Sequence, residues 1–432
     1  MSSSSHSSRI TKQSWAGLAL LWLLAAVASA DTFNSTAPSF ATPLQTNFTF
    51  VGPDLPGGDR PRPYLFCDVT ITQADVDAQQ PYVMVKSGRY CLAEDITVSA
   101  RLETFRIAAS NVELWFAGRT LSDLTHPWAD THDERIAIAI TEGVANVWIH
   151  GGTLRDFEVG IRTFGPARQM ASGKLDKVLP ADLIRELNIE DMTVEVLDLG
   201  FDLDSLVTAT IANNTMRCPV CMHVTQGDGV TISDNVLDLD SRGGTTFGIL
   251  AGWAMPGLWI VNNTIRGEVH EAGIGIYLST WKSSGGVVLE KNTFSGLDSA
   301  LWVYASDATG HTIRHNTVHG GPLPYTSINP PPVGYQGGNL AQPYAMYIGN
   351  TPRTALYGNA IFSAAGGKSY DQGIVLFGHT TIRPQANGRP ALYDNETCGT
   401  QTPLVAPVGV PLHQVEDTGN NSWESCRFAA PQ

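Results

Sequence analysis

The sequence predicts an all-β solenoid, a parallel β-helix, and three observations support this prediction. A β-branched alternating run closed by Asn recurs between residues 229 and 318. Its closing residues Asn235, Asn263, Asn292 and Asn316 are 28, 29 and 24 residues apart, a spacing typical of stacked repeats. A second apolar phrase alternates with the first, and no helical period lies between the two. Because one such repeat is too short to bury its own apolar face, consecutive repeats must stack.

The first phrase has the form of a short strand that ends in an Asn corner. Its copies cover residues 230–236, 258–265, 287–294 and 311–318, with earlier versions at 111–118 and 146–154. Asn suits a corner because its side chain hydrogen-bonds locally and tolerates left-handed backbone angles. Stacked asparagines can also form a ladder between neighbouring coils. We therefore expect these asparagines to be structural.

The second phrase consists of Gly or Ala followed by alternating apolar residues. Its copies begin at Gly160, Gly200, Gly248, Gly273, Ala300, Ala345 and Gly373. Because successive side chains of a strand point to opposite faces, the apolar positions should point into the coil and the others outward. The positions expected to point outward are Arg162, Asp202, Asp204, Leu250, Gly275, Tyr277, Trp302, Tyr304, Tyr347, Val375 and Phe377. This face is acidic in its N-terminal half and aromatic in its C-terminal half.

Residues 1–30 have the three regions of a secretory signal peptide. A Ser-rich start is followed by an apolar run from Trp15 to Val27 and by the small residues Ala28, Ser29 and Ala30. An uncleaved anchor is the alternative, but an apolar run of about 13 residues is short for a bilayer span. No later stretch is apolar enough to cross a membrane. The sequence thus predicts an exported protein, either secreted or periplasmic.

The rest of the chain divides into four parts. They are an extended leader at 31–63, an N-terminal cap with the first strands at 64–110, the parallel β-helix at 111–397 and a C-terminal tail at 398–432. The leader is rich in Ser, Thr, Pro and Gly, so it cannot bury enough apolar surface to fold alone. A solenoid needs atypical end coils to cover its core, which is the role expected of the cap. Insertions at 123–134, 165–180 and 320–343 should form loops beside the coils.

The six cysteines form an even set, as expected of an exported chain with disulfides. The simplest pairing is local, and it joins Cys67 to Cys91, Cys218 to Cys221 and Cys398 to Cys426. The spacing of Cys218 and Cys221 also occurs in redox and metal sites, but no second pair completes a zinc site. We therefore expect the close pair to close a loop.

The formal net charge of −14 disfavours nucleic acid as a partner, because no basic stripe is present to neutralise phosphates. A polyanionic substrate would also be repelled on average, unless a local cationic patch or a bound Ca²⁺ intervenes. The charge is otherwise explained by solubility alone. The sequence therefore assigns no metal ligand, and Ca²⁺ is the one cofactor alternative. It gives no indication of oligomeric state.

These phrases resemble the right-handed parallel β-helix of the pectin-lyase-like superfamily, and residues 88–92 with 111–114 resemble the first coil of its secreted β-helix-repeat proteins. The resemblance covers residues 82–395 and implies the fold, not the chemistry. The Asn-Thr-Asp, Asp-Asp, Gly-His-Gly and Arg-x-Lys set of the polygalacturonase-like hydrolases is absent. The closest match to the Asp-Pro-His-Asp motif of mannuronan epimerases is residues 130–133, which lack the Pro.

Two carboxylates are the first candidates for chemistry. Asp202 and Asp204 are two apart on one strand, so both should emerge on the same side as an acid and base pair or a Ca²⁺ site. The alternative is a solvated acidic strand. A lyase or epimerase acting on uronates needs a group that neutralises the carboxylate, a base and an acid. Arg162 and Lys282 are the nearby cations, and Tyr277, Tyr304 and His311 can move protons. The expected catalytic residues are Asp202, Asp204, Arg162, Lys282 and Tyr304.

The aromatic residues are the second candidates. Tyr277, Trp302, Tyr347 and Phe377 recur once per coil, at about 4.8 Å, which suits the stacking of sugar rings. The alternative is that the insertions fold over these rings and bury them. We therefore predict a carbohydrate-active protein with a polysaccharide partner, a lyase or epimerase acting in a groove on this face. A non-catalytic glycan- or matrix-binding protein is the alternative, and a structural surface protein is a third hypothesis.

Overall fold

The computed structural model describes a set of segments that covers most of the chain between residues 66 and 405. They are 66–99, 102–124, 134–165, 180–240, 246–267, 273–280, 286–305, 310–320, 344–349, 351, 354–362, 370, 372–377, 392–398, 400, 402–405 and 421. The predicted signal peptide and leader lie outside these segments, as do Lys282, Cys426 and residues 130–133.

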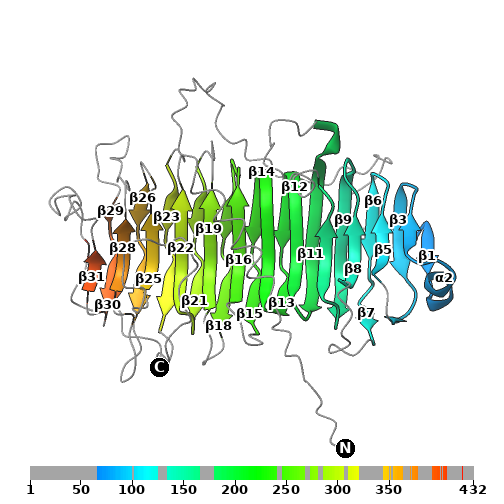
Figure 1. Ribbon diagram of the computed structural model, residues 1–432, viewed down its shortest axis with the longest axis horizontal. Helices are drawn as coiled ribbons and strands as arrows, with labels where there is room; N and C mark the ends of the chain where they lie inside the picture. Colours follow the sequence, from blue (N-terminus) through cyan, green and yellow to red (C-terminus); the bar gives the residue numbers. More distant parts are fainter. Residues whose placement is uncertain are drawn as a thin grey trace, which may run out of the picture.

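The strands stack side by side along the long axis of the molecule, from β1 beside the only α-helix of the described segments to β31 at the other end (Figure 1). Every described strand pair is parallel, and each strand pairs with the equivalent strand of the next coil. The structure therefore confirms the predicted fold class, a parallel β-helix. Three strand segments make up each coil, so the solenoid has three faces, named A, B and C below in chain order.

Face A contains β2 (Tyr82–Met84), β5 (Glu103–Ile107), β8 (Ile136–Ile140), β10 (Val159–Thr163), β12 (Leu199–Ala212), β14 (Val220–Ser233), β16 (Thr246–Trp253), β19 (Gly273–Thr280), β22 (Ser299–Ala305), β25 (Tyr344–Gly349), β28 (Gln372–Phe377) and β31 (Thr402–Val405). Only the first halves of β12 and β14 belong to this face, because both strands continue onto face B.

Face B contains β1 (Val69–Ile71), β3 (Gly88–Leu92), β6 (Val112–Trp115), β9 (Ala145–Arg155), β11 (Ile184–Glu195), β17 (Trp259–Val261), β20 (Val288–Glu290), β23 (Thr312–Arg314), β26 (Ala355–Tyr357) and β29 (Leu392–Tyr393). The second halves of β12 and β14 complete it, and β9 and β11 continue onto face C.

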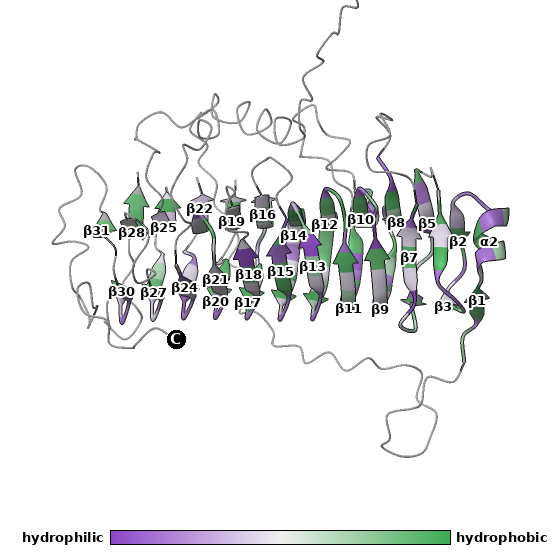
Figure 2. Cartoon of the chain, turned by 90° about the horizontal axis from the view of Figure 1, so that it is seen from below, coloured by the Kyte–Doolittle hydropathy of each residue, from purple (hydrophilic) through white to green (hydrophobic). Residues whose placement is uncertain are grey.

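Face C contains β4 (Ile96–Val98), β7 (Thr120–Asp123), β13 (Thr215–Cys218), β15 (Val236–Leu239), β18 (Thr264–Gly267), β21 (Thr293–Ser295), β24 (Thr317–His319), β27 (Ala360–Phe362) and β30 (Glu396–Cys398). Figure 2 shows the row from β31 to β16 on face A separated from the row from β30 to β18 on face C.

The core consists of inward side chains that align from coil to coil. One column on face A contains Ile138, Ile161, Phe201, Met222, Ile249, Ile276, Leu301, Met346 and Ile374, all fully buried. Most of these positions are the apolar residues of the second phrase. The inward assignment of that phrase is therefore confirmed, except at Ile274, which lies outside the core cluster in register with the half-buried Phe247.

An Asn ladder runs between faces B and C, as the first phrase predicts. The Nδ2 atom of each Asn donates to Oδ1 of the next at 2.9 to 3.0 Å, in the order Asn214, Asn235, Asn263, Asn292, Asn316, Asn359, Asn395 and Asn421. A backbone carbonyl of an earlier coil accepts a second hydrogen bond from each Nδ2, as at Asn292 with Ile260 O. The ladder fixes the register between coils, because one misaligned coil would leave buried amides unpaired.

At the described corners, the left-handed residue is the one before the ladder Asn. Asp234, Asn262, Lys291 and His315 have φ angles of 55° to 58°, whereas the ladder asparagines do not have positive φ. The expectation that Asn supplies the left-handed angle is therefore wrong for the ladder residues. The turn at the preceding residue instead directs each ladder side chain into the buried interior, where the amide hydrogen bonds are strongest.

A short helix, α2 (Gln73–Ala78), lies at the N-terminal end beside the first strands. Thr72 caps it, since its side chain accepts from the backbone N–H of Asp75. The side chain of Gln73 replaces a strand at the outer side of β4. Its Nε2 donates to Thr97 O at 2.9 Å and its Oε1 accepts from Thr97 N at 2.8 Å. This contact satisfies an edge that would otherwise be open to another chain.

Two of the predicted disulfides are present, Cys67–Cys91 and Cys218–Cys221. Cys398 is also disulfide-bonded, and its predicted partner Cys426 lies outside the described residues. Disulfides persist in oxidising compartments, so these bridges are compatible with the predicted export. Within the described segments, no helix is long and apolar enough to cross a membrane.

Candidate functional site

Two outward columns on face A contain most of the predicted site residues. The first is Arg162, Asp202, His223, Leu250, Tyr277, Trp302, Tyr347 and Val375, and the second is Asp204, Thr225, Gly252, Ser279, Tyr304, Gly349 and Phe377. Apart from Gly275, every predicted outward residue belongs to one of them. Gly275 was wrongly assigned, since a Cβ atom there would lie 2.5 Å from the core residue Phe294. It aligns with Gly248, so the Gly that opens this copy of the phrase is Gly275 and not Gly273.

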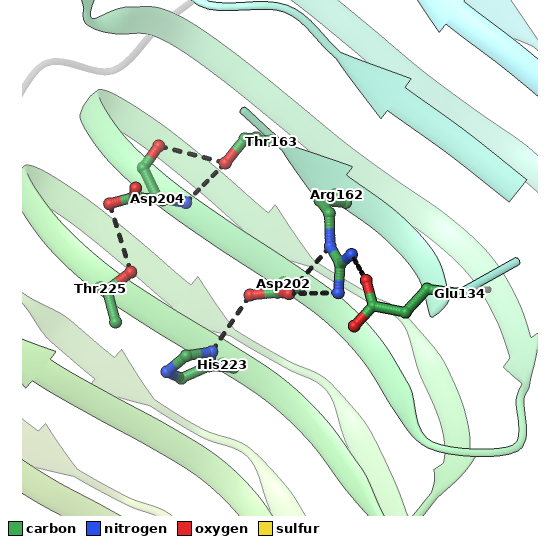
Figure 3. Close-up of polar contacts among 7 residues, drawn as sticks. All are labelled: Glu134, Arg162, Thr163, Asp202, Asp204, His223 and Thr225. Carbon is green, nitrogen blue, oxygen red and sulfur yellow. Dashed lines mark hydrogen bonds and ion pairs between the residues drawn. The ribbon is translucent and has the colours of Figure 1, made fainter. Parts of the chain in front are cut away.

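Asp202 is at the centre of a polar network that spans three coils (Figure 3). Nε and Nη2 of Arg162 both lie 3.0 Å from its Oδ2, and Nδ1 of His223 lies 3.1 Å from its Oδ1. Arg162 also pairs with Glu134, which precedes β8. Asp202 is only 1% exposed, so its charge is compensated by these partners and not by water.

Arg162 is held as a permanent cation. Burial acts to lower its pKa, but the charges of Asp202 and Glu134 outweigh that effect and raise the pKa above its ordinary value. Both ends of the guanidinium face protein carboxylates, and the residue is buried. Arg162 therefore compensates charge within the protein, and the role first expected of it, neutralising a substrate carboxylate, has no support in these contacts.

His223 and Glu134 are the two members of the network that reach solvent. The side chain of His223 is 26% exposed, against 1% for Asp202. When Nδ1 carries the proton it donates to Asp202, and Nε2 then has a lone pair directed away from that contact. Among the described residues, Nε2 has no hydrogen-bond partner. This arrangement, an imidazole oriented by a buried carboxylate, is the geometry of a general base.

Asp204 is held by hydrogen bonds to neighbouring side chains of the protein. It is buried, and its Oδ1 accepts from Thr225 Oγ1 and from Ser205 Oγ, each at 3.2 Å. Its backbone N–H donates to Thr163 Oγ1 at 2.5 Å, and that hydroxyl donates to its carbonyl oxygen at 3.1 Å. Asp202 and Asp204 thus lie on the same outward side as predicted, but they have separate hydrogen-bond partners (Figure 3).

A third carboxyl group, Asp198, precedes β12. Burial, together with the charges of Glu134, Glu158 and Asp202, raises its pKa to about 6 against the opposing effect of Arg162. Its backbone lies between those of two neighbouring coils, with its N–H donating to Glu158 O and its carbonyl accepting from Val220 N. A carboxyl group with this pKa can be protonated at mildly acidic pH and can act as a proton donor.

The aromatic part of the first column is largely buried. Tyr347 is 1% exposed and Tyr277 is 7% exposed, while Trp302 between them is half-buried. The Trp302 ring centroid lies 5.8 Å from that of Tyr277 and 5.2 Å from that of Tyr347. Among the described rings of the two columns, Tyr277 and Tyr347 are therefore not solvent-exposed, and Trp302 and Tyr304 are half-exposed.

Two of the residues expected to move protons, Tyr277 and His311, are buried. Burial raises the pKa of Tyr277 to about 12, which disfavours a role in moving protons at neutral pH. His311 lies in the core just before β23 on face B and is far from the outward columns in the coil, so its assignment to this site is wrong. Phe377 aligns with Gly349 in the second column. The predicted cation Lys282 is among the residues that are not described.

His223 and Glu134 were not identified from the sequence. Residues 221–225 align with residues 200–204 in register, so His223 occupies the position of Asp202 one coil later. This copy begins with Cys221, which forms a disulfide with Cys218, whereas the other copies begin with Gly or Ala. For this reason the sequence pattern did not reveal it. The alternation of Met222, His223 and Val224 was the available signal. Glu134 lies at the end of an insertion, where no periodicity assigns a face.

Within the described segments, no group of three or more His, Cys, Asp or Glu side chains is arranged to hold a metal ion. The Ca²⁺ alternative for Asp202 and Asp204 therefore has no supporting cluster there. Arg162 contacts Oδ2 of Asp202, and the hydroxyls of Ser205 and Thr225 donate to Oδ1 of Asp204, so each carboxylate already has a protein donor on one of its oxygens.

No protein-family model matches the chain, and no curated protein is similar to it in sequence. Among solved structures, the A-module of the mannuronan C-5 epimerase AlgE6 from Azotobacter vinelandii is 14% identical with a TM-score of 0.44, and the match covers 83% of this chain and 94% of that chain. The A-module of AlgE4 from the same organism is 13% identical with a TM-score of 0.26, over 77% and 91% of the two chains. These values concern the fold and assign no chemistry to this chain.

Proposed function

We propose that this protein is a polysaccharide lyase or C5-epimerase that acts on uronate-containing glycans at face A, with His223 as the base. The observation that carries the proposal is the contact between Asp202 Oδ1 and His223 Nδ1 at 3.1 Å, on an imidazole that reaches solvent. A buried carboxylate that fixes the tautomer of a partly exposed His is a recurrent device of acid–base catalysis.

The chemistry begins at the carbon next to the sugar carboxylate. His223 Nε2 takes the C5 proton, and the carboxylate of Asp202, which is paired with Arg162, stabilises the imidazolium that forms. In a lyase, the electron pair left at C5 forms the C4–C5 double bond and expels the glycosidic oxygen from C4. In an epimerase, a proton returns to C5 from the opposite face of the ring. Both reactions share the first step, so both require the same base.

Asp198 is suited to the acid role. Its pKa of about 6 leaves a substantial protonated fraction at mildly acidic pH. A protonated carboxyl can donate to the substrate carboxylate or to the leaving oxygen, whereas an ionised one would repel the uronate. Burial and the neighbouring carboxylates thus favour the protonated form of Asp198, which is a proton donor in a part of the molecule that otherwise carries negative charge. Trp302 and Tyr304, farther along the same columns, can stack against adjoining sugars.

A non-catalytic glycan-binding protein is the second candidate, and one observation favours it. Arg162 is fully engaged by Asp202 and Glu134, so the network can also be explained as an ion-pair chain that holds the coils in register. In that case His223 completes the chain and abstracts no proton. The half-exposed Trp302 and Tyr304 would then be the functional residues.

The test is to incubate the mature protein with polymannuronate, polyguluronate, polygalacturonate and glucuronan, with neutral glycans as controls. Ultraviolet absorbance detects the unsaturated lyase product, and NMR in D₂O detects deuterium at C5. The proposal predicts one of these signals on at least one uronate polymer, and a reduction of about 10²- to 10⁴-fold in His223→Gln. The matched control His315→Asn removes an exposed His from the corner between faces B and C and should keep full activity. Binding of a uronate polymer without either signal would support the second candidate.

A further inference from the structure

An uncharged strip of outward side chains lies on face B, away from the network on face A. It consists of Trp148, Asn188, Thr210, Thr231 and Trp259, which occupy the same register position in five successive coils. All five side chains are half-buried on the outer side of the sheet. The strip thus has an indole at each end and an amide and two hydroxyls between them.

The length of the strip follows from strand spacing. Four steps of about 4.8 Å separate the two tryptophans by about 19 Å along the helix axis. Among the described residues, none hydrogen-bonds the side chains of Asn188, Thr210 or Thr231. Their donors and acceptors therefore remain available to a ligand that lies along the axis, within reach of both indoles.

The first indole is held in place by its neighbours. The Trp148 ring stacks on the His150 ring with centroids 4.2 Å apart and an interplanar angle of 20°. His150 Nε2 lies 3.1 Å from Glu113 Oε1, and Nε of Arg89 donates to Oε2 of the same carboxylate at 2.7 Å. A ring fixed in this way loses little conformational entropy when a ligand stacks on it.

The charges beside the strip exclude one class of ligand. Glu190 aligns with His150 in the adjacent outward column, and Asp191 follows it. Burial raises the pKa of Glu190, and the charge of Asp191 raises it further. No cationic side chain belongs to the strip itself. An anionic polymer would therefore meet carboxylates beside the strip, whereas a neutral ligand would avoid that cost.

We propose that the strip is a second glycan-binding site, and that it takes a neutral polysaccharide chain lying parallel to the helix axis. Pyranose rings present apolar C–H faces to the two indoles, and their hydroxyls hydrogen-bond Asn188, Thr210 and Thr231. This site does not depend on the acid–base network of face A. It would attach the protein to an uncharged glycan while face A acts on a uronate.

The experiment is isothermal titration calorimetry of the full mature chain with three soluble hexasaccharides, of β-1,4-glucose, β-1,4-mannose and α-1,4-glucose. The proposal expects binding to at least one of them, and at least tenfold weaker binding in Trp259→Ala. The double variant Thr210→Val and Thr231→Val keeps β-branched residues in both strands, so it tests the hydroxyls without threatening the fold. It should weaken binding at least threefold.

Controls separate this site from face A. His223→Gln should bind the neutral hexasaccharide as the wild type does, and Trp259→Ala should keep any activity on uronates. The absence of binding to all three hexasaccharides would overturn the proposal. Unchanged affinity in both Trp259→Ala and the double Thr variant would also overturn it, as would effective competition by a uronate hexasaccharide. The loss of uronate activity in His223→Gln bears only on face A.

Discussion

His311 should make the stability of this protein sensitive to mild acid. Its side chain is fully buried just before β23, in register with Val287 in the preceding coil and Thr354 in the following one. Neither ring nitrogen has a hydrogen-bond partner among the described residues. Burial accordingly lowers the pKa of His311 from 6.5 to about 4, because the cationic form would lose its hydration without gaining a partner.

The sign and size of the effect follow from the two pKa values. The unfolded chain binds the proton more tightly, so the stability contributed by neutral His311 is fully present above about pH 6.5. It is lost as the pH falls from about 6.5 towards 4, and the loss is complete below the folded-state value. Between about pH 7.5 and pH 5 the linkage relation gives a loss of about 2 kcal/mol, and the full loss is about 3.4 kcal/mol.

The measurement must compare variants, because other groups oppose His311. Burial raises the pKa values of Asp198 and Asp298 to about 6, so their protonation favours the folded state over part of the same range. His311→Leu removes only the His311 contribution, and Leu258 already occupies the equivalent position two coils earlier. His315→Asn is the matched control, since His315 is exposed in the same coil.

The assay is urea unfolding followed by intrinsic fluorescence at about pH 7.5 and pH 5. As the pH falls from about 7.5 to 5, we expect the free energy of unfolding of His311→Leu to rise by about 2 kcal/mol relative to that of the wild type. His315→Asn should show no change of this size. His311→Leu should also be more stable at the higher pH, since two unsatisfied buried nitrogens are removed. If the difference between His311→Leu and the wild type is the same at both pH values, the deduction from burial is wrong.

Three further predictions concern the ladder and the site. Asn292→Ala should lower the free energy of unfolding by about 3–5 kcal/mol, because it leaves ladder groups of Asn263 and Asn316 unpaired. The control Thr293→Ala should lower it by about 1 kcal/mol in the same denaturation assay. Arg162→Met should destabilise the fold by about 3–5 kcal/mol by leaving Asp202 uncompensated, and retained stability would contradict the network. If Asp198 is the acid, uronate turnover should fall as the pH rises through about 6, and Asp198→Asn should remove that limb of the rate profile.

The fold was predictable because its signals repeat. The Asn residues of the first phrase form the ladder, and the apolar positions of the second phrase form the core column. Each copy supports the others, so one irregular coil does not hide the period. The same alternation predicted that Arg162 and Asp202 share a column, and the register confirms it.

The candidate site was only partly predictable, because it depends on single positions. His223 occupies a copy of the phrase altered by the disulfide at Cys221, and Glu134 comes from an insertion without periodicity. The burial of Tyr277 and Tyr347 depends on what packs against an outward column, which alternation alone does not reveal. His311 illustrates the same limit, since a polar residue at an apolar core position gives no sign of its burial.

The measurement that tests the central claim most directly is deuterium incorporation at C5 of a uronate polymer in D₂O. Wild-type protein and His223→Gln are compared on the same polymer, because Gln can keep the hydrogen bond to Asp202 but cannot accept the proton. The account predicts deuterium at C5, or the unsaturated product that follows C5 proton loss, with the wild type and about 10²- to 10⁴-fold less with the variant. Equal rates for the two proteins would contradict the assignment of His223 as the base.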